Sequence, residues 1–148
     1  MSYAIDVNVL LYASDATSPF SKRARAFLDE CATGPEVLCL AWTTVASYLR
    51  LSTHPAIFAN PLSPEDAERN VESLLGLPHA RVLAEQEGFW DVYRGVTRGL
   101  AVRGNGVPDA HLAALLRQHD VPTLHTNDRD FLKFGFLKVR NPFEEKVR

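Results

Sequence analysis

Three aspartates, Asp6, Asp109 and Asp128, stand where a carboxylate could take part in chemistry. Asp6 interrupts an almost continuous apolar run from Tyr3 to Leu11, which predicts a buried strand. A carboxylate buried there costs several kcal/mol unless it is paired, protonated or bound to a metal. Asp109 lies near the start of a predicted helix, and Asp128 follows a short predicted strand at 123–125. Because strand ends and the helix starts that follow them meet in one crevice of an open parallel sheet, we expect the three carboxylates to converge.

Such a cluster of carboxylates repels itself and requires neutralisation. Oxygen-only ligands favour a hard divalent cation, Mg²⁺ or Mn²⁺, which keeps open positions for a substrate phosphate. Two of the acids also have a purely structural explanation. Asp109 suits the positive end of a helix dipole, and Asp128 forms a turn-type sequence with Asn127 and Asp130. Asp6 is therefore the strongest single indication of function.

The apolar pattern predicts the elements that must position these acids. Short strand-like runs alternate with longer helical ones, which is typical of the α/β class. We expect strands over 3–11, 37–40, 81–83, 123–125 and 137–139. We expect helices over 22–32, 42–51, 89–100 and 108–119, and one more that begins near Ser63-Pro64 and ends at Gly76.

Composition excludes several classes of protein. The 148 residues, 46% of them hydrophobic, fit a single domain spanning 1–148. No apolar run is long enough to span a bilayer, and the N-terminus has no secretory signal, so we expect a cytoplasmic protein with no membrane contact. Cys31 and Cys39 have no metal-site or disulfide spacing. The net charge of −2 excludes binding of nucleic acid by bulk electrostatics, so any such contact must be local.

Three segments, Ile5–Tyr12, Val107–Ala114 and Leu124–Phe131, have the order and spacing of motifs in PIN-domain ribonucleases. The chain resembles the VapC toxins of toxin-antitoxin pairs, and residues 42–61 and 140–143 are similar to one VapC subgroup. The resemblance implies a PIN-like three-layer fold with a mostly parallel central sheet of about five strands flanked by helices. It also implies a Mg²⁺-dependent endoribonuclease, with Mn²⁺ as a substitute, an RNA substrate such as tRNA or rRNA, a VapB-type antitoxin and a homodimer.

The resemblance assigns roles to individual residues. It places Asp6, Asp109 and Asp128 at the catalytic, metal-binding positions. It makes Asn8, Thr126 and the further acid Asp130 supports of the pocket.

One position departs from the family pattern. Many PIN domains have a glutamate where this chain has Ser47, which favours a single-metal site or one completed by the substrate. Five glutamates are candidate replacements: Glu65, Glu68, Glu72, Glu85 and Glu87. Arg50, one helical turn from Ser47, either contacts an RNA phosphate or is a solvated surface residue.

Two other functions compete with the nuclease. A haloacid-dehalogenase-like phosphatase also begins with a strand ending in Asp-x-Asp and uses Mg²⁺, but here the second acid is Asn8 and the general acid would be missing. A catalytically weak PIN-fold module that binds RNA or protein is the other alternative, suggested by Ser47. The five histidines have no metal-site spacing and are interpreted as structural.

Overall fold

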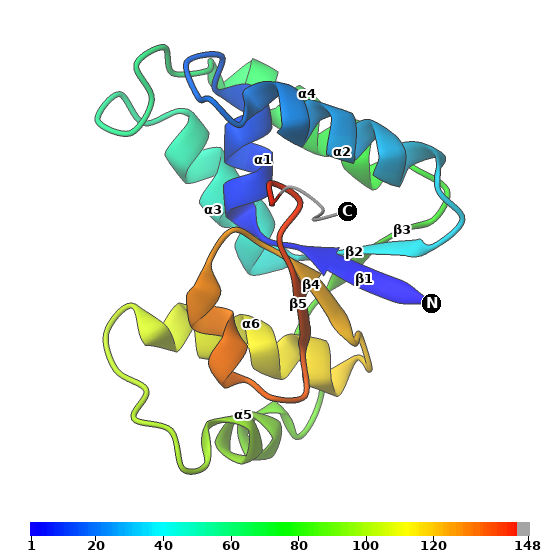
Figure 1. The fold of residues 1–148 in the computed structure, drawn as a ribbon, viewed down its shortest axis with the longest axis vertical. Coiled ribbons are helices and arrows are strands. Elements are labelled where there is room, and N and C mark those ends of the chain that lie inside the picture. The colour runs from blue at the N-terminus through cyan, green and yellow to red at the C-terminus, as the bar shows by residue number, and fades with distance from the viewer. Residues whose placement is uncertain (145–148) are drawn as a thin grey trace.

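A computed structural model describes residues 1–144 of the chain, so the last four positions of the expected domain lie outside the described residues. Five parallel strands form one sheet in the order β3-β2-β1-β4-β5 (Figure 1). The strands are β1 (Ser2–Ile5), β2 (Val37–Ala41), β3 (Ala80–Leu83), β4 (Thr123–His125) and β5 (Lys138–Arg140). The expectation of an α/β fold with about five mostly parallel strands is confirmed.

Helices cover both faces of this sheet and complete the three layers (Figure 1). One face carries α1 (Val7–Ser14), α2 (Ser21–Thr33), α3 (Trp42–Ser52) and α4 (Pro64–Leu75). The other face carries α5 (Phe89–Thr97), α6 (Gly106–Gln118) and the short 3-10 helix η1 (Arg129–Lys133). Among the described residues, no helix has the length and apolar character needed to cross a bilayer.

The two layers of helices bury two separate cores because side chains alternate between the faces of a strand. Tyr3 and Ile5 of β1 pack with α1 and α2, whereas Ala4 packs with α6 on the opposite face. α6 presents Ala110 and Ala113 to the sheet, both fully buried. These small side chains let the helix backbone come close to the strands, which matters because α6 also carries Asp109.

The strand predicted over 3–11 is wrong beyond residue 5. β1 ends at Ile5, and the apolar residues that follow form helix α1. Asp6 has extended backbone angles (φ −79°, ψ 159°) and its carboxylate accepts a hydrogen bond from the amide of Val7, so it caps α1. A short apolar run has the same appearance in a buried strand and in a buried helix, which explains the error. Asp6 therefore stands at a strand-to-helix junction, not inside a strand.

The other elements lie close to their predicted positions. Ser63 caps α4 by accepting a hydrogen bond from the amide of Asp66 at 3.1 Å, and Gly76 ends that helix, both as expected. α6 starts two residues before the predicted position, at Gly106, so Asp109 is the fourth helical residue.

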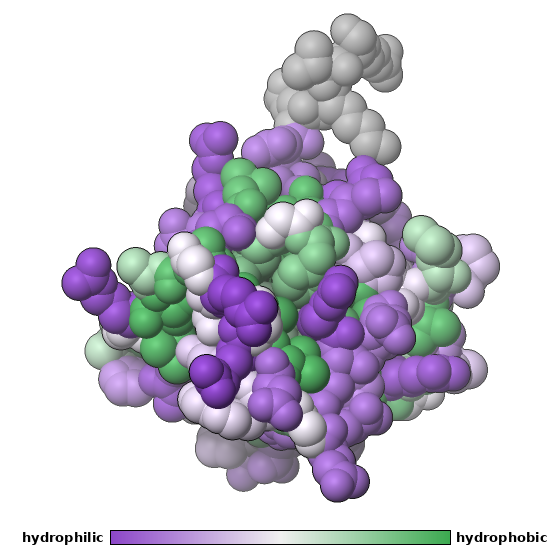
Figure 2. Space-filling model, turned by 90° about the horizontal axis from the view of Figure 1, so that it is seen from below, coloured by the Kyte–Doolittle hydropathy of each residue, from purple (hydrophilic) through white to green (hydrophobic). Residues whose placement is uncertain are grey.

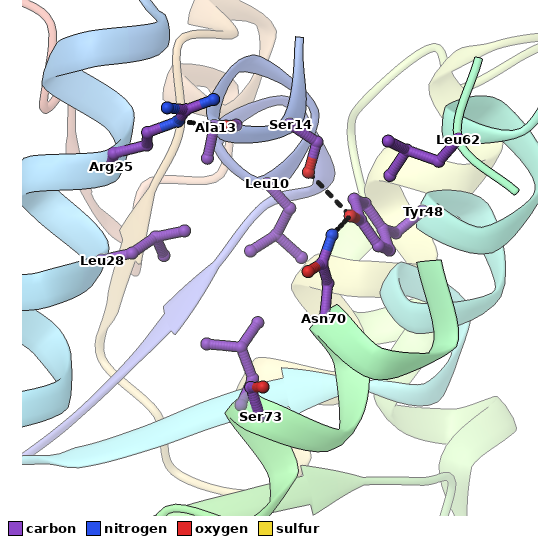
Figure 3. Close-up of a pocket in the computed structure, with 10 residues that line it drawn as sticks. Leu10, Ala13, Ser14, Arg25, Leu28, Tyr48, Leu62, Asn70 and Ser73 are labelled. Carbon is purple, nitrogen blue, oxygen red and sulfur yellow. Dashed lines mark hydrogen bonds between the residues drawn. The ribbon is translucent and has the colours of Figure 1, made fainter. Parts of the chain in front are cut away.

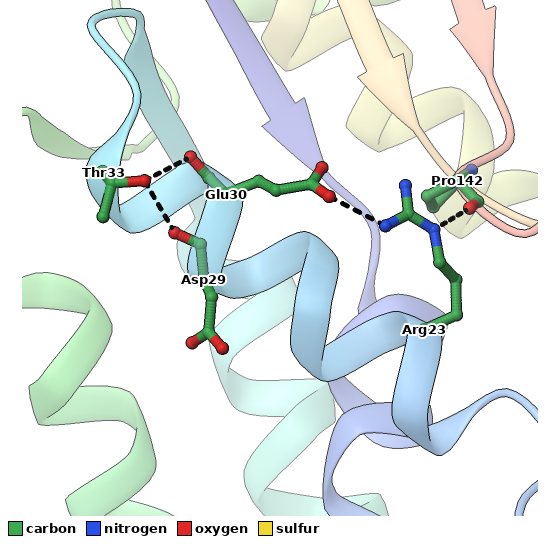
Figure 4. A network of polar contacts seen from close by, with 5 residues as sticks. All are labelled: Arg23, Asp29, Glu30, Thr33 and Pro142. Atoms are coloured by element: carbon green, nitrogen blue, oxygen red, sulfur yellow. Dashed lines mark hydrogen bonds and ion pairs between the residues drawn. The ribbon is translucent and has the colours of Figure 1, made fainter.

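Polar contacts fasten the segment after β5 to α2 (Figure 4). The guanidinium of Arg23 donates to the carbonyl of Pro142 and to the carboxylate of Glu30, each at 2.9 Å. The ring of Phe143 packs against Tyr12 and Phe20. The chain leaving the sheet edge is thus held over α1 and α2.

The face at the bottom of Figure 1 has a mixed surface. Figure 2 shows several separate apolar groups among hydrophilic side chains there. α5 has no buried residue, and Trp90 is 66% exposed and stacks on Tyr93.

We expect Leu124→Ala to lower the free energy of unfolding by about 3 kcal/mol, because Leu124 is fully buried in β4 and its loss leaves a cavity. Leu132→Ala, at a site that is 58% exposed, is the control and should change it by under about 0.5 kcal/mol. Urea denaturation monitored by circular dichroism measures both. Equal losses for the two variants would contradict this account of the core.

Candidate active site

The carboxyl ends of two neighbouring strands build the centre of the site. β1 and β4 pair in parallel with Ile5 opposite His125, so Asp6 and Thr126 emerge side by side from the sheet. The amide of Asp6 continues the ladder by donating to the carbonyl of His125 at 3.0 Å. Asp128 follows two residues later, and α6 brings Asp109 to the same edge.

The hydroxyl of Thr126 joins the two strand ends. It donates to Oδ2 of Asp6 at 2.7 Å and accepts from the side-chain amide of Asn8 and from the backbone amide of Asp128, each at 3.0 Å. One donor and two acceptors use the full capacity of a hydroxyl group. The oxygen of the Asn8 side chain accepts from the amide of Asn127 at 3.2 Å, which adds a second link. Thr126 and Asn8 therefore fix where Asp6 and Asp128 stand.

Three carboxylates come together in front of this junction. An oxygen of each of Asp109, Asp128 and Asp130 lies within 4.8 Å of the other two. Asp128 also caps η1, since its Oδ1 accepts from the amide of Asp130 at 2.9 Å. Asp130, expected only as a supporting acid, is as central to this cluster as Asp109.

Asp6 is not one of these three residues, but it lies close enough for its charge to act on Asp109. The residue is 8% exposed, and its carboxylate accepts hydrogen bonds on both oxygens, from Val7 on one and from Asn8 and Thr126 on the other. Burial raises the pKa of Asp6, and the hydrogen bonds from Thr126 and Val7 oppose this effect. The charge of Asp128 raises this pKa further, so the two carboxylates are electrostatically coupled.

The cluster also perturbs Asp109. Burial, followed by the charges of Asp128 and Asp6, raises the pKa of Asp109 to about 6, while Lys133 opposes this rise. Mutual repulsion of this kind is relieved when a divalent cation binds between the carboxylates. All the donors are oxygen atoms, a set that suits Mg²⁺, Mn²⁺ or Ca²⁺. The residues present therefore fit a divalent metal ion.

A cleft of about 370 Å³ opens beside the acids, between α3 and α6. Asp6 and Asp109 line it together with Ser47, which places Ser47 at the same site as the acids. The complete lining is Asp6, Val7, Thr43, Thr44, Ser47, Val107, Pro108, Asp109, His111 and Leu112.

Other residues named from the sequence lie elsewhere. Arg50 is exposed in the last turn of α3 and does not line the cleft. Three candidate replacements for the missing acid, Glu65, Glu68 and Glu72, belong to α4 and do not line it either. Glu87 is exposed before α5 and is also outside the lining. Glu85 is the candidate that comes nearest, because its carboxylate lies 2.6 Å from Nε2 of His111.

Sequence reasoning missed His111, Thr43 and Thr44 as cleft residues. A signal was available for His111, since it follows Asp109 by two residues on the same predicted helix. None was available for the threonines, whose position depends on how α3 packs beside α6.

A second cavity, of about 440 Å³, lies among α1, α2, α3 and α4 (Figure 3). The hydroxyl of Tyr48 sits in it, 2.7 Å from the hydroxyl of Ser14, and accepts from the side-chain amide of Asn70 at 2.9 Å. Its lining is Leu10, Ala13, Ser14, Arg25, Leu28, Tyr48, Leu62, Asn70, Ser73 and Leu74. With no carboxylate in that lining, this cavity is chemically unlike the acidic site.

Comparison with known proteins agrees with this architecture. The sequence profile of the PIN domain matches residues 3–137, which include all four acids and Thr126. The chain belongs to the PIN-domain family.

Within that family the chain groups with VapC proteins. It is 43% identical to ribonuclease VapC48 of Mycobacterium tuberculosis over 97% of this chain and 99% of that protein. The fold is similar to that in the crystal structure of VapBC2 from Rickettsia felis bound to a promoter DNA fragment (TM-score 0.66, 17% identity, 95% of this chain and 98% of that one). It is also similar to Mycobacterium tuberculosis VapC20, a toxin that cleaves the sarcin-ricin loop (TM-score 0.66, 17% identity, 93% and 98%).

We expect Ser47→Glu to tighten Mn²⁺ binding by about tenfold, because it adds a carboxylate to the cleft that Asp6 and Asp109 line. Isothermal titration calorimetry measures the dissociation constant. Ser73→Glu, at an exposed serine of α4, is the control and should leave the affinity unchanged. An unaltered affinity in Ser47→Glu would mean that Ser47 does not occupy the acidic position of the family.

The raised pKa of Asp109 predicts how stability depends on pH without metal. The folded protein holds a proton on Asp109 up to about pH 6, whereas the ordinary pKa of an aspartate is 3.8, so the free energy of unfolding falls as pH rises between these values. We expect Asp109→Asn to remove part of this fall, on the order of 1 kcal/mol because solvent screens the half-exposed group. Thermal denaturation in EDTA at pH 4.5 and pH 7 tests this, with Asp91→Asn, an exposed first-turn aspartate of α5, as the control. Identical pH dependence in wild type and Asp109→Asn would refute the electrostatic argument.

Proposed function

We propose that this chain is a metal-dependent endoribonuclease and the toxin of a toxin-antitoxin pair. The observation that carries the proposal is the convergence of Asp109, Asp128 and Asp130 in front of Asp6. Four carboxylates at one edge of a sheet are costly in a protein without a metal ion to neutralise them. The 43% identity to a ribonuclease, over nearly the whole length of both chains, supports RNA as the substrate.

The proposed cofactor is Mg²⁺, with Mn²⁺ as a substitute. Asp6, Asp109 and Asp128 would hold it. Asp109 and Asp128 lie within 4.8 Å of each other and of Asp130, which adds a fourth carboxylate. When bound, such an ion supplies an activated water and offsets negative charge on the phosphodiester. Thr126 and Asn8 keep the carboxylate of Asp6 in place through their hydrogen bonds. Lys133, whose charge acts on Asp109, adds a positive group at the rim for the RNA backbone.

Ser47 leaves the site one carboxylate short of the usual family pattern. A serine hydroxyl is a weaker ligand than a carboxylate for a hard cation, so we propose a site that binds one ion firmly and needs the substrate for any second ion.

We also propose a VapB-type antitoxin as the partner. Support comes from similarity of fold to a VapC protein in a VapBC complex. We propose a cytoplasmic location and a single domain over 1–148 as well. For a homodimer, the exposed Trp90 stacked on Tyr93 offers aromatic surface on α5.

The phosphatase alternative has less support. Asn8 stands where its second acid would be, and its amide donates to Asp6 at 3.2 Å and to Thr126 at 3.0 Å. An amide cannot serve as a general acid. The non-catalytic binding module remains as an outcome of the test below.

The test is cleavage of total cellular RNA by the purified protein. We expect discrete fragments with Mg²⁺ or Mn²⁺ and none in EDTA, and we expect Asp109→Asn to lower the rate by at least about 100-fold because a ligand carboxylate is lost. Asp91→Asn should cleave as wild type does. Mapping the fragment ends identifies the target RNA.

Full activity of Asp109→Asn, or cleavage that persists in EDTA, would refute the proposed mechanism. Binding of RNA without cleavage under any metal condition would favour the binding module.

A further inference from the structure

The cleft between α3 and α6 is continuous with the acidic centre. Asp6 and Asp109 form part of its lining, and His111 lies in the same cleft on another face of α6. Residues two apart on a helix point about 200° apart. Pro108 and Leu112, about one helical turn apart, line the cleft between them. Asp109 and His111 therefore flank the cleft from opposite sides.

The two walls of this cleft differ in chemistry. α3 contributes the hydroxyl groups of Thr43, Thr44 and Ser47. Thr43 is exposed and Ser47 is half-buried, so both side chains can be reached from the cleft. α6 contributes apolar side chains, of which Val107 is 43% exposed. A small number of polar groups in an otherwise apolar cleft can fix the orientation of a bound ligand.

His111 is held in one orientation. Its Nε2 lies 2.6 Å from Oε1 of Glu85, and its ring packs against Phe89 with 5.1 Å between ring centroids. A carboxylate that holds one ring nitrogen leaves the other nitrogen oriented for a further contact. Glu85 is half exposed and is not in the cleft lining, so it acts through His111.

We propose that this cleft binds one ribonucleotide next to the phosphate that is cleaved, with Thr43 and Ser47 contacting its ribose and Glu85 positioning His111 at the edge. The proposal rests on the proposed ribonuclease function and specifies where that site recognises its substrate.

The shape and chemistry of the cleft suit this occupant. Its volume of about 370 Å³ is in the range of small-ligand sites. The flat face of a nucleotide base is apolar, as is the side of the cleft that α6 forms with Val107. The ribose is polar, as is the side that α3 forms with its hydroxyl groups. Contact with the 2′-hydroxyl is the way in which a protein distinguishes RNA from DNA at a given nucleotide. A single-stranded substrate suits such a cleft, because an unpaired base can leave its stack and enter it.

The first experiment blocks the cleft. Thr43→Met places a bulky side chain there without altering a carboxylate or Ser47, and Ser73→Met places one in the second cavity. The probe is a single-stranded RNA oligonucleotide that spans the mapped cleavage position. Fluorescence anisotropy in Ca²⁺ gives its Kd, steady-state cleavage gives KM and kcat, and calorimetry gives the Kd for Mn²⁺.

We expect Thr43→Met to raise both the KM and the Kd for RNA by about tenfold, while Mn²⁺ affinity stays within about twofold of wild type. Ser73→Met should match wild type throughout. Unchanged RNA binding in Thr43→Met, with cleavage intact, would overturn the cleft assignment and leave the ribonuclease function standing. Absence of cleavage by the wild-type protein would instead count against the proposed function.

The second experiment needs no bulky substitution. The oligonucleotide carries a single 2′-deoxy nucleotide on one side or the other of the cleavage position. We expect one of these probes to bind wild type about threefold more weakly than the all-RNA probe, and Thr43→Val to bind both probes alike. Equal sensitivity of Thr43→Val and wild type to the 2′-deoxy change would refute the ribose contact.

The kinetic constants of a Glu85 variant test its positioning role separately. Glu85→Gln should raise KM severalfold with kcat unchanged, because Glu85 orients His111 without touching RNA. Glu87→Gln is the matched control, since Glu87 is exposed and does not line the cleft. A fall in kcat alone would exclude a positioning role in binding.

Discussion

The hydrogen bond between the Thr126 hydroxyl and the Asp6 carboxylate, at 2.7 Å, is the constraint on which the site depends. It joins residues that are 120 positions apart in the sequence and adjacent in the sheet. Since the same hydroxyl also accepts from Asn8 and from the amide of Asp128, one buried group fixes two acids at once. The parallel pairing of β1 and β4 makes this contact possible, and the burial of both residues makes it strong.

Without a bound cation, this arrangement of carboxylates is electrostatically unfavourable. Burial and neighbouring charges raise the pKa of Asp6 and of Asp109, so the fold keeps negative groups where they repel one another. The tightly packed strands and the fully buried alanines of α6 provide the stability that offsets this repulsion. Functional sites typically carry a local electrostatic cost of this kind, which the packing of the rest of the protein offsets.

Much of the fold could be predicted from the sequence, because apolar periodicity and the Ser63 and Gly76 helix boundaries are local signals. The junction at Asp6 could not, because a run such as Val7–Leu11 fits a strand or a helix until its packing partners are known. Motif spacing found the acids at 6, 109 and 128. It could not show that Asp130 joins the cluster, that Arg50 stays outside the cleft, or that Glu85 meets His111, since these facts depend on how separate elements pack.

The edge strand β5 has a consequence for how copies of this protein associate. It is three residues long, and two of them, Lys138 and Arg140, are exposed cations. The opposite edge, β3, exposes Arg81. Short, charged edges disfavour the addition of a strand from another chain, because the incoming backbone would have to pair beside unneutralised charge. The sheet is thereby protected against edge-to-edge aggregation, and any ordered assembly is directed to the helical faces.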